Sequence, residues 1–216
     1  MTRQLSMALQ TQALRRTAQE RGLLFYTNGM SEQKLTREFS ICLLPTENVA
    51  TDIETIRNSL PDSPYRDDIP HITLLRGITA HTDLSDDALA QALESILSPE
   101  DNLPLEGNVV GIANKSNQFY SSTGLLLLEA SPRLTDFRKQ VADRLKRHNY
   151  DVEAQELANF MPHITIRLGI ALEGASLHDA EELFRDRSIT FSDWLLFRLI
   201  EEGDKRIMHQ VWPYSI

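Results

Sequence analysis

The chain has very little cysteine: Cys42 is its single cysteine in 216 residues. One cysteine cannot form an internal disulfide, which excludes the class of small secreted proteins stapled by disulfides. No apolar run reaches the roughly 20 residues that a membrane-spanning helix requires, and the N-terminal segment lacks the continuous apolar core of a secretion signal. The sequence therefore predicts a cytoplasmic protein with no membrane partner.

Positive charge is also scarce, because 22 lysines and arginines face 31 aspartates and glutamates and leave a net charge of −9. Such a body repels a long polyanion, so we expect no extended tract for nucleic acid. Small phosphate esters and RNA ends stay open, since a cleft can be locally positive on an acidic protein. The sequence has no phosphate-cradling glycine loop, which argues against ATP-driven ligation. We expect no cofactor.

The chain does contain two nearly identical five-residue segments, Pro-His-Ile-Thr-Leu at 70–74 and Pro-His-Ile-Thr-Ile at 162–166. Both copies are apolar and β-branched, which is typical of buried strands. Side chains two residues apart on a strand point to the same side, so His71 lies beside Thr73 and His163 beside Thr165. Two such strands brought together would place two imidazoles and two hydroxyls around one small volume.

The order of predicted elements also occurs twice. Apolar periodicity and capping signals predict strand, helix, histidine strand, helix and strand in each pass. The first pass is a strand at 39–44, a helix at 48–60, the His71 strand, a helix opening at Ser85 and a strand at 105–113. The second is a strand at 124–129, a helix at 133–147, the His163 strand, a helix at 177–187 and a strand at 189–200, and a short strand at 206–212 closes the chain.

This duplication predicts an α+β fold of two pseudo-symmetric lobes. We expect each lobe to be an antiparallel sheet backed by helices, with the active-site groove between the two histidine strands. Leucines repeat at a helical interval in residues 2–21, so residues 1–36 are predicted to be an N-terminal helical extension and residues 37–216 the bilobal domain.

Histidine is the side chain whose ordinary pKa, about 6.5, lets it exchange protons near neutrality. A pair can divide the work at a phosphate, because a neutral imidazole deprotonates the attacking oxygen while an imidazolium protonates the leaving one. In-line displacement at phosphorus puts those two oxygens on opposite sides of the phosphorus atom, and two symmetry-related strands can place one histidine on each side. Threonine hydroxyls can donate hydrogen bonds to the non-bridging oxygens.

Through these two segments the chain resembles the 2H phosphoesterase superfamily, which includes 2′-5′ RNA ligase-like and cyclic phosphodiesterase-like proteins with two His-x-Thr/Ser motifs in duplicated lobes. The resemblance covers about residue 38 to the C-terminus. It implies that His71 and His163 act as general acid and base without a metal, and that Thr73 and Thr165 hold the phosphate. Relatives hydrolyse 2′,3′-cyclic phosphates to 2′-phosphates, join or cleave 2′-5′ RNA linkages, or only bind nucleotides.

Arg167 comes four residues after His163, so an unbroken strand would turn it to the same face as Thr165, where it could clamp the phosphate. Asp67 and Asp68 precede His71 and raise the question of a metal. A metal site needs three or more protein ligands, and His163 has no nearby carboxylate on its strand face, so no metal is predicted.

The sequence thus predicts an enzyme: a metal-independent hydrolase in RNA processing that opens a nucleoside 2′,3′-cyclic phosphate or an RNA 2′,3′-cyclic end. Two alternatives stay open. One is a 2′-5′ RNA ligase, which would use the same residues on RNA ends, and the other is a nucleotide-binding module without turnover. The motif does not decide which histidine is the base, and the sequence leaves the oligomeric state open.

Overall fold

The computed structural model describes residues 33–63, 69–97, 105–116, 122–152, 160–202 and 205–212. Its first half contains β1 (Gln33–Pro45), α2 (Glu47–Ser59), β2 (Ile72–Ala80), α3 (Asp86–Leu97) and β3 (Leu105–Asn114). Its second half contains β4 (Thr123–Ala130), α4 (Pro132–Arg147), β5 (Tyr150–Asp151), β6 (His163–Leu168), α6 (Gly174–Phe184), β7 (Ser188–Glu202) and β8 (Lys205–Trp212). The described strands pair antiparallel and carry helices on one face, which confirms the predicted α+β class.

The helices form where apolar residues repeat at a helical interval. In α4 this stripe includes Leu134, Val141 and Leu145, all buried. The helix begins cleanly because the Ser131 hydroxyl accepts a hydrogen bond from the Leu134 amide at 3.1 Å, and Pro132 fills a first-turn position that needs no amide donor. The predicted helix at 133–147 is thus confirmed within one residue.

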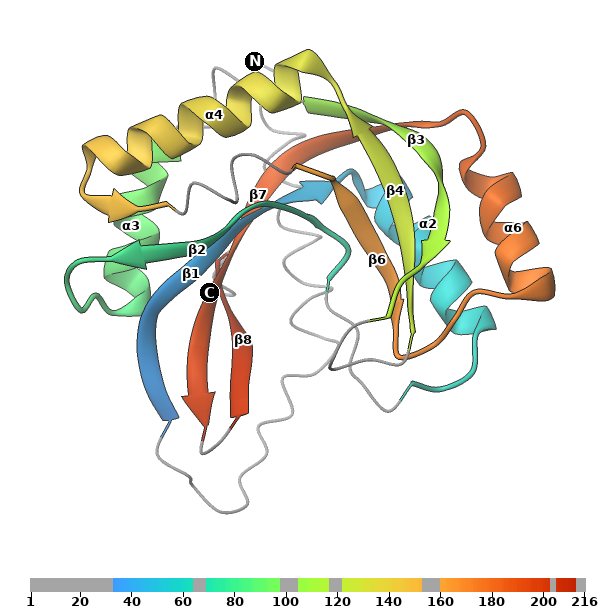
Figure 1. Ribbon diagram of the computed structural model, residues 1–216, viewed down its shortest axis with the longest axis horizontal. Coiled ribbons are helices and arrows are strands. Elements are labelled where there is room, and N and C mark those ends of the chain that lie inside the picture. The colour runs from blue at the N-terminus through green and yellow to red at the C-terminus, as the bar shows by residue number, and fades with distance from the viewer. Residues whose placement is uncertain are drawn as a thin grey trace, which may run out of the picture.

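The strands fall into two groups, which is consistent with the two expected lobes (Figure 1). One group contains β1, β2 and β8 with the longer part of β7, and the other contains β3, β4 and β6. The strand order is β1-β2-β6-β4-β3-β7-β8, and β1 also pairs with β7. Strand β7 runs through both groups, because residues 188–191 pair with β3 and later residues pair with β1.

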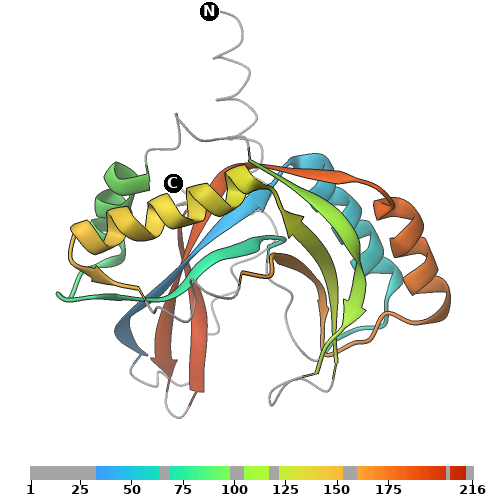
Figure 2. The same ribbon diagram turned by 45° about the horizontal axis from the view of Figure 1, so that its top comes forward.

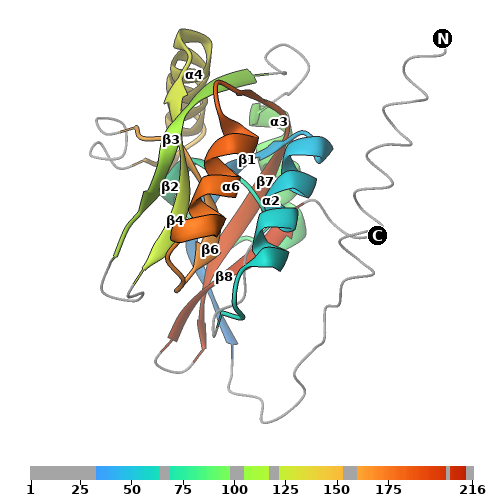
Figure 3. The ribbon, with the colours of Figure 1, turned by 90° about the vertical axis from the view of Figure 1, so that its right-hand side faces the viewer.

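The two halves of the chain exchange elements. Each pass gives its last strand to the other group, since β3 pairs with β4 while β7 pairs with β1. Helices are exchanged too: α2 packs beside α6 and touches β6, whereas α4 packs beside α3 and touches β2. Figure 2 shows α3 and α4 on one side of the molecule with α2 and α6 on the other, and Figure 3 shows α2 and α6 side by side. Neither lobe is therefore built from one half of the sequence.

The sheet separates two apolar regions. The main core lies between the sheet and the helices and includes Ile72 and Ile164, each 0% exposed. A smaller cluster of Cys42, Leu195 and Phe197 forms separately from it. Cys42 is buried within this smaller cluster.

Part of the predicted organisation lies outside the described residues. The helix at 2–21 and most of the extension at 1–36 belong to this part, as do Asp67 and Asp68. Strand β1 begins at Gln33, so the last four residues of the predicted extension are strand. Across the described ranges, no helix has both the length and the apolar character needed to cross a membrane.

Candidate active site

The two histidine strands meet at one antiparallel pair, Ile72 with Ile164. Continuing this register by one residue in each direction sets His71 opposite Thr165 and Thr73 opposite His163. Because neighbouring side chains on a strand alternate, these four side chains share the face opposite the two buried isoleucines. Residues placed diagonally on one face of an antiparallel pair lie about 7–8 Å apart, and extending the register gives His71 and His163 this diagonal relation.

Both imidazoles are oriented by the same local hydrogen bond. Nδ1 of His71 lies 2.6 Å from the carbonyl oxygen of Ile69, and Nδ1 of His163 lies 3.0 Å from that of Met161. A carbonyl oxygen only accepts, so Nδ1 carries the proton in each ring and donates it. In the neutral ring this tautomer puts the lone pair on Nε2. The two half-buried rings thus have the same tautomer and the same kind of orienting hydrogen bond, so either can act as base or acid.

The surroundings of the four residues are largely apolar. The His71 ring lies 5.1 Å from the Phe197 ring between centroids, with the planes tilted by 52°. On the other side, Leu125 and Leu127 of β4 are the strand partners of Thr165 and His163. Such walls lower the local dielectric, which strengthens hydrogen bonds and charge interactions made at this face. Sequence reasoning did not single out Phe197, which comes from β7, far along the chain.

Arg167 does not follow the simple alternation that the sequence predicts. The pairing of β6 with β4 shifts between Leu125, the partner of Thr165, and Gly124, the partner of Arg167. Adjacent residues of β4 face opposite sides, so this irregularity turns Arg167 away from the face of Thr165. Its guanidinium donates from Nη2 to the carbonyl oxygen of Pro61 at 2.8 Å, just beyond α2. The phosphate contact of Arg167 stays a prediction that no longer rests on strand parity.

Two buried arginines lie behind the histidine strands, and the sequence pattern alone did not single them out. Arg57 of α2 and Arg138 of α4 are 4% and 5% exposed, and both donate to strand carbonyls. A signal for them was present, because each lies four residues after an apolar residue of its helix's buried stripe, Ile53 or Leu134. A charged residue at such a position needs buried partners, which can be sought once the fold is known.

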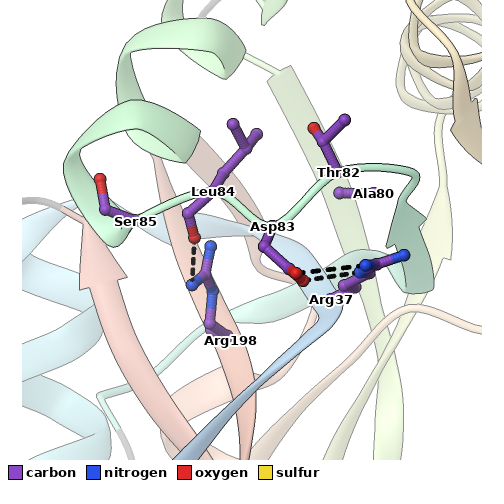
Figure 4. Close-up of a pocket in the computed structure, with 7 residues that line it drawn as sticks. All are labelled: Arg37, Ala80, Thr82, Asp83, Leu84, Ser85 and Arg198. Atoms are coloured by element: carbon purple, nitrogen blue, oxygen red, sulfur yellow. Dashed lines mark hydrogen bonds and ion pairs between the residues drawn. The ribbon is translucent and has the colours of Figure 1, made fainter.

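A separate pocket of about 350 Å³ lies at the far end of β2 (Figure 4). Arg37 donates to both carboxylate oxygens of Asp83 at 2.7 and 3.2 Å, and this hydrogen bond, with the charge of Asp83, raises the pKa of Arg37. Arg198 donates to the Leu84 carbonyl oxygen at 2.7 Å and lies 3.1 Å from Asp86. These charges balance, so the pocket is built around structural ion pairs. It lies at Ala80, the opposite end of β2 from the His71 motif.

Comparison with known proteins finds one matching family model and several similar solved structures. The family model described as the 2′-5′ RNA ligase superfamily matches residues 45–195, a range that contains both His-x-Thr segments. No curated protein matches the sequence. Among solved structures, the chain is similar to a protein described as a phosphoesterase, at 12% identity and a TM-score of 0.49, over 81% of this chain and 95% of that one.

Two further solved structures are similar over most of the chain. LigT of E. coli, crystallised with 3′-AMP, shares 12% identity at a TM-score of 0.48, over 81% of this chain and 95% of that one. TT0787 of Thermus thermophilus shares 14% identity at a TM-score of 0.45, over 80% of this chain and 94% of that one.

Proposed function

The chain belongs to the 2′-5′ RNA ligase superfamily, and on that premise we propose that it hydrolyses a cyclic phosphodiester by general acid–base catalysis with two histidines. The proposed substrate is a nucleoside 2′,3′-cyclic phosphate or an RNA end bearing one. Family membership confirms the resemblance drawn from the two His-x-Thr segments. The hydrolytic reaction, its substrate and the residue roles are our proposal.

The observation that most supports the proposed function is the pairing of Ile72 with Ile164. This pair brings segments 92 residues apart together, and extending its register by one residue in each direction would set each histidine opposite the threonine of the other segment. A duplicated motif with only a structural role has no need for such a reciprocal arrangement. The matching hydrogen bonds from Nδ1 to a carbonyl two residues earlier support the same conclusion, since they orient both rings alike.

In the proposed reaction, Nε2 of one neutral imidazole takes a proton from water as the water oxygen attacks phosphorus. The bond from phosphorus to the leaving ribose oxygen breaks on the opposite side, and the other imidazolium protonates that oxygen. The hydroxyls of Thr73 and Thr165 donate to the non-bridging oxygens, where charge must be stabilised. After one turnover the two histidines have exchanged protonation states, and proton exchange with solvent resets them.

The test is turnover of a panel of 2′,3′-cyclic mononucleotides and cyclic-ended oligonucleotides in excess chelator. We expect hydrolysis that survives the chelator, with a bell-shaped pH–rate profile that has one limb for each histidine. His71→Ala and His163→Ala should each lower kcat by about 10²–10⁴-fold with little change in thermal unfolding. His178→Ala, an exposed position on α6, is the matched control and should keep wild-type activity.

The outcomes separate this proposal from its alternatives. Near-full activity of either motif variant would end the proposed roles of the histidines. Joining of RNA ends without hydrolysis would identify a ligase, and nucleotide binding by calorimetry with no turnover across the panel would identify a binding module. Activity that disappears with the chelator and returns with added metal would contradict metal independence.

A further inference from the structure

We propose that Arg57 and Arg138 are a crossed pair of positioning residues that hold the two His-x-Thr strands in register for catalysis. The inference rests on the proposed function for its kinetic consequence, although its structural consequence can be measured without any turnover. Both arginines donate to backbone carbonyls of residues that follow each histidine, and we infer that they act through that backbone.

Arg57 binds the second histidine strand. Its Nε donates to the carbonyl oxygen of Ile166 at 2.6 Å, and its Nη2 donates to that of Thr165 at 2.9 Å. The planar guanidinium therefore holds two successive carbonyls at once, one of them on the predicted phosphate-binding threonine. Its Nη1 donates to the carboxylate of Glu54 at 2.8 Å, one turn earlier on α2, which keeps the charged group satisfied although the side chain is buried.

Arg138 binds the first histidine strand in a matching way. Its Nε donates to the carbonyl oxygen of Leu74 at 2.8 Å. Leu74 comes three residues after His71, as Ile166 comes three residues after His163, so the two Nε donors reach equivalent backbone positions. The Arg138 guanidinium also lies over the Phe160 ring, 4.5 Å from its centroid, which compensates part of the cost of burying its charge.

The two contacts cross between the halves of the chain. Arg57 is on α2, the helix that precedes the His71 strand, yet it binds the His163 strand. Arg138 is on α4, the helix before the His163 strand, yet it binds the His71 strand. Each arginine therefore links the segment leading to one histidine with the strand that bears the other, which ties the positions of the two motifs together.

The sheet itself does little to fix that spacing. Within the described residues, Ile72 and Ile164 form the only pair that joins β2 to β6. By contrast, β6 is paired with β4 along residues 123–127 of β4. The separation of the histidine strands thus depends on groups behind the sheet, and two buried guanidiniums bonded to the strand carbonyls are rigid enough to provide it.

Lysine distinguishes positioning from a purely electrostatic role, because it keeps the charge but cannot reproduce the planar fork. We expect Arg57→Lys and Arg138→Lys each to lower kcat by about 10²-fold, the scale of a small misplacement of reacting groups, while KM stays near the wild-type value. The matched control is Arg144→Lys, also on α4, whose side chain donates to the Ile96 carbonyl of α3 rather than to a histidine strand. That control should keep wild-type kcat.

A second readout does not depend on activity. In ¹H–¹⁵N NMR spectra of the imidazoles, assigned by the peaks missing in His71→Ala and His163→Ala, we expect Arg57→Lys to shift the His163 signals and leave those of His71. Arg138→Lys should do the reverse, and Arg144→Lys should shift neither. Glu54→Ala offers a milder change at a partly exposed position, and it should shift the His163 signals in the same direction as Arg57→Lys.

The results separate this inference from the proposed function. If the wild type hydrolyses nothing while the crossed NMR pattern appears, the function fails and the positioning role stands. If the wild type is active but both lysine variants keep wild-type kcat and show no crossed pattern, the positioning role is overturned. If the lysine variants do not fold, Glu54→Ala decides, and unchanged His163 signals in that variant overturn the role of Arg57.

Discussion

Gly124 of β4 is a position where packing requires the absence of a side chain. A Cβ added there would lie 2.5 Å from Leu172 Cδ1 and 2.9 Å from Cγ, and Leu172 is fully buried. Leu172 is in turn fixed from the backbone, since its amide donates to the Asn114 side chain at 2.8 Å and its carbonyl accepts from that side chain at 2.9 Å. It cannot move aside cheaply.

We therefore predict that Gly124→Ala lowers the free energy of unfolding by about 1–3 kcal/mol, the cost of overpacking a core. Urea denaturation followed by circular dichroism measures this change. Gly107→Ala in β3 is the control, because a Cβ there meets its nearest neighbour, the Glu129 carbonyl oxygen, at 3.4 Å. Equal stability of the two variants would contradict the packing argument.

Single residues also show how far the sequence could predict the site. The repeated motif was sufficient to select His71, Thr73, His163 and Thr165, because residue type and spacing carry the chemistry. The parity argument for Arg167 assumed an unbroken strand, and the register shift beside Gly124 depends on tertiary packing that a local pattern does not contain. The buried arginines were missed for a similar reason, since their partners lie 64 and 109 residues away.

At the scale of elements, α4 and α2 differ in how they begin. Ser131 caps α4 by accepting a hydrogen bond from a helix amide, whereas the hydroxyl of Thr46, at the equivalent position of α2, donates to the Asn48 side chain at 2.6 Å and caps no amide. We predict that Ser131→Ala lowers the free energy of unfolding by about 1 kcal/mol, while Thr46→Ala changes it by less. Thermal unfolding of both variants measures the difference, and a larger effect at Thr46 would refute the prediction.

Most elements could be placed from the sequence because apolar periodicity is strong in them, as in the predicted helix at 48–60, which spans Glu47–Ser59. The predicted helix at 177–187 was wrong by three residues at each end. It begins at Gly174, which has φ +54°, and it ends at Phe184, before Asp186 adopts φ +51°. Backbone conformations of this kind are set by individual turns and leave little trace in a periodic pattern.

The exchange of strands and helices between halves could not be predicted from the pattern. Periodicity shows which face of an element is buried, but it does not show which partner covers that face. The composition of β3 would allow it to pair with a strand of its own half or with a strand of the other half. The structure pairs it with β4 and β7, both of the other half. The two strand groups are therefore consistent with the predicted lobes, while tertiary contacts decide which elements belong to each group.

At the scale of the whole molecule, this exchange makes each half of the chain dependent on the other. We predict that fragments 1–118 and 119–216 show no cooperative thermal transition when studied alone, because β1 lacks β7 and β4 lacks β3. Mixing the fragments should restore a cooperative transition and hydrolysis, since both histidine strands are then present. A cooperative transition of the isolated fragment 1–118 would contradict the interdependence, and circular dichroism during heating would reveal it.

The pairing of β1 with β7 has a consequence for protein synthesis. Ile41 pairs with Leu196, which is 155 positions later in the chain. At the usual elongation rates, a ribosome needs roughly 8–30 s to cover that distance, so β1 waits for its partner as a nascent strand with an open edge. Co-translational folding of the first lobe is therefore delayed until β7 has been synthesised, and molecular chaperones have that interval in which to shield the unpaired strand.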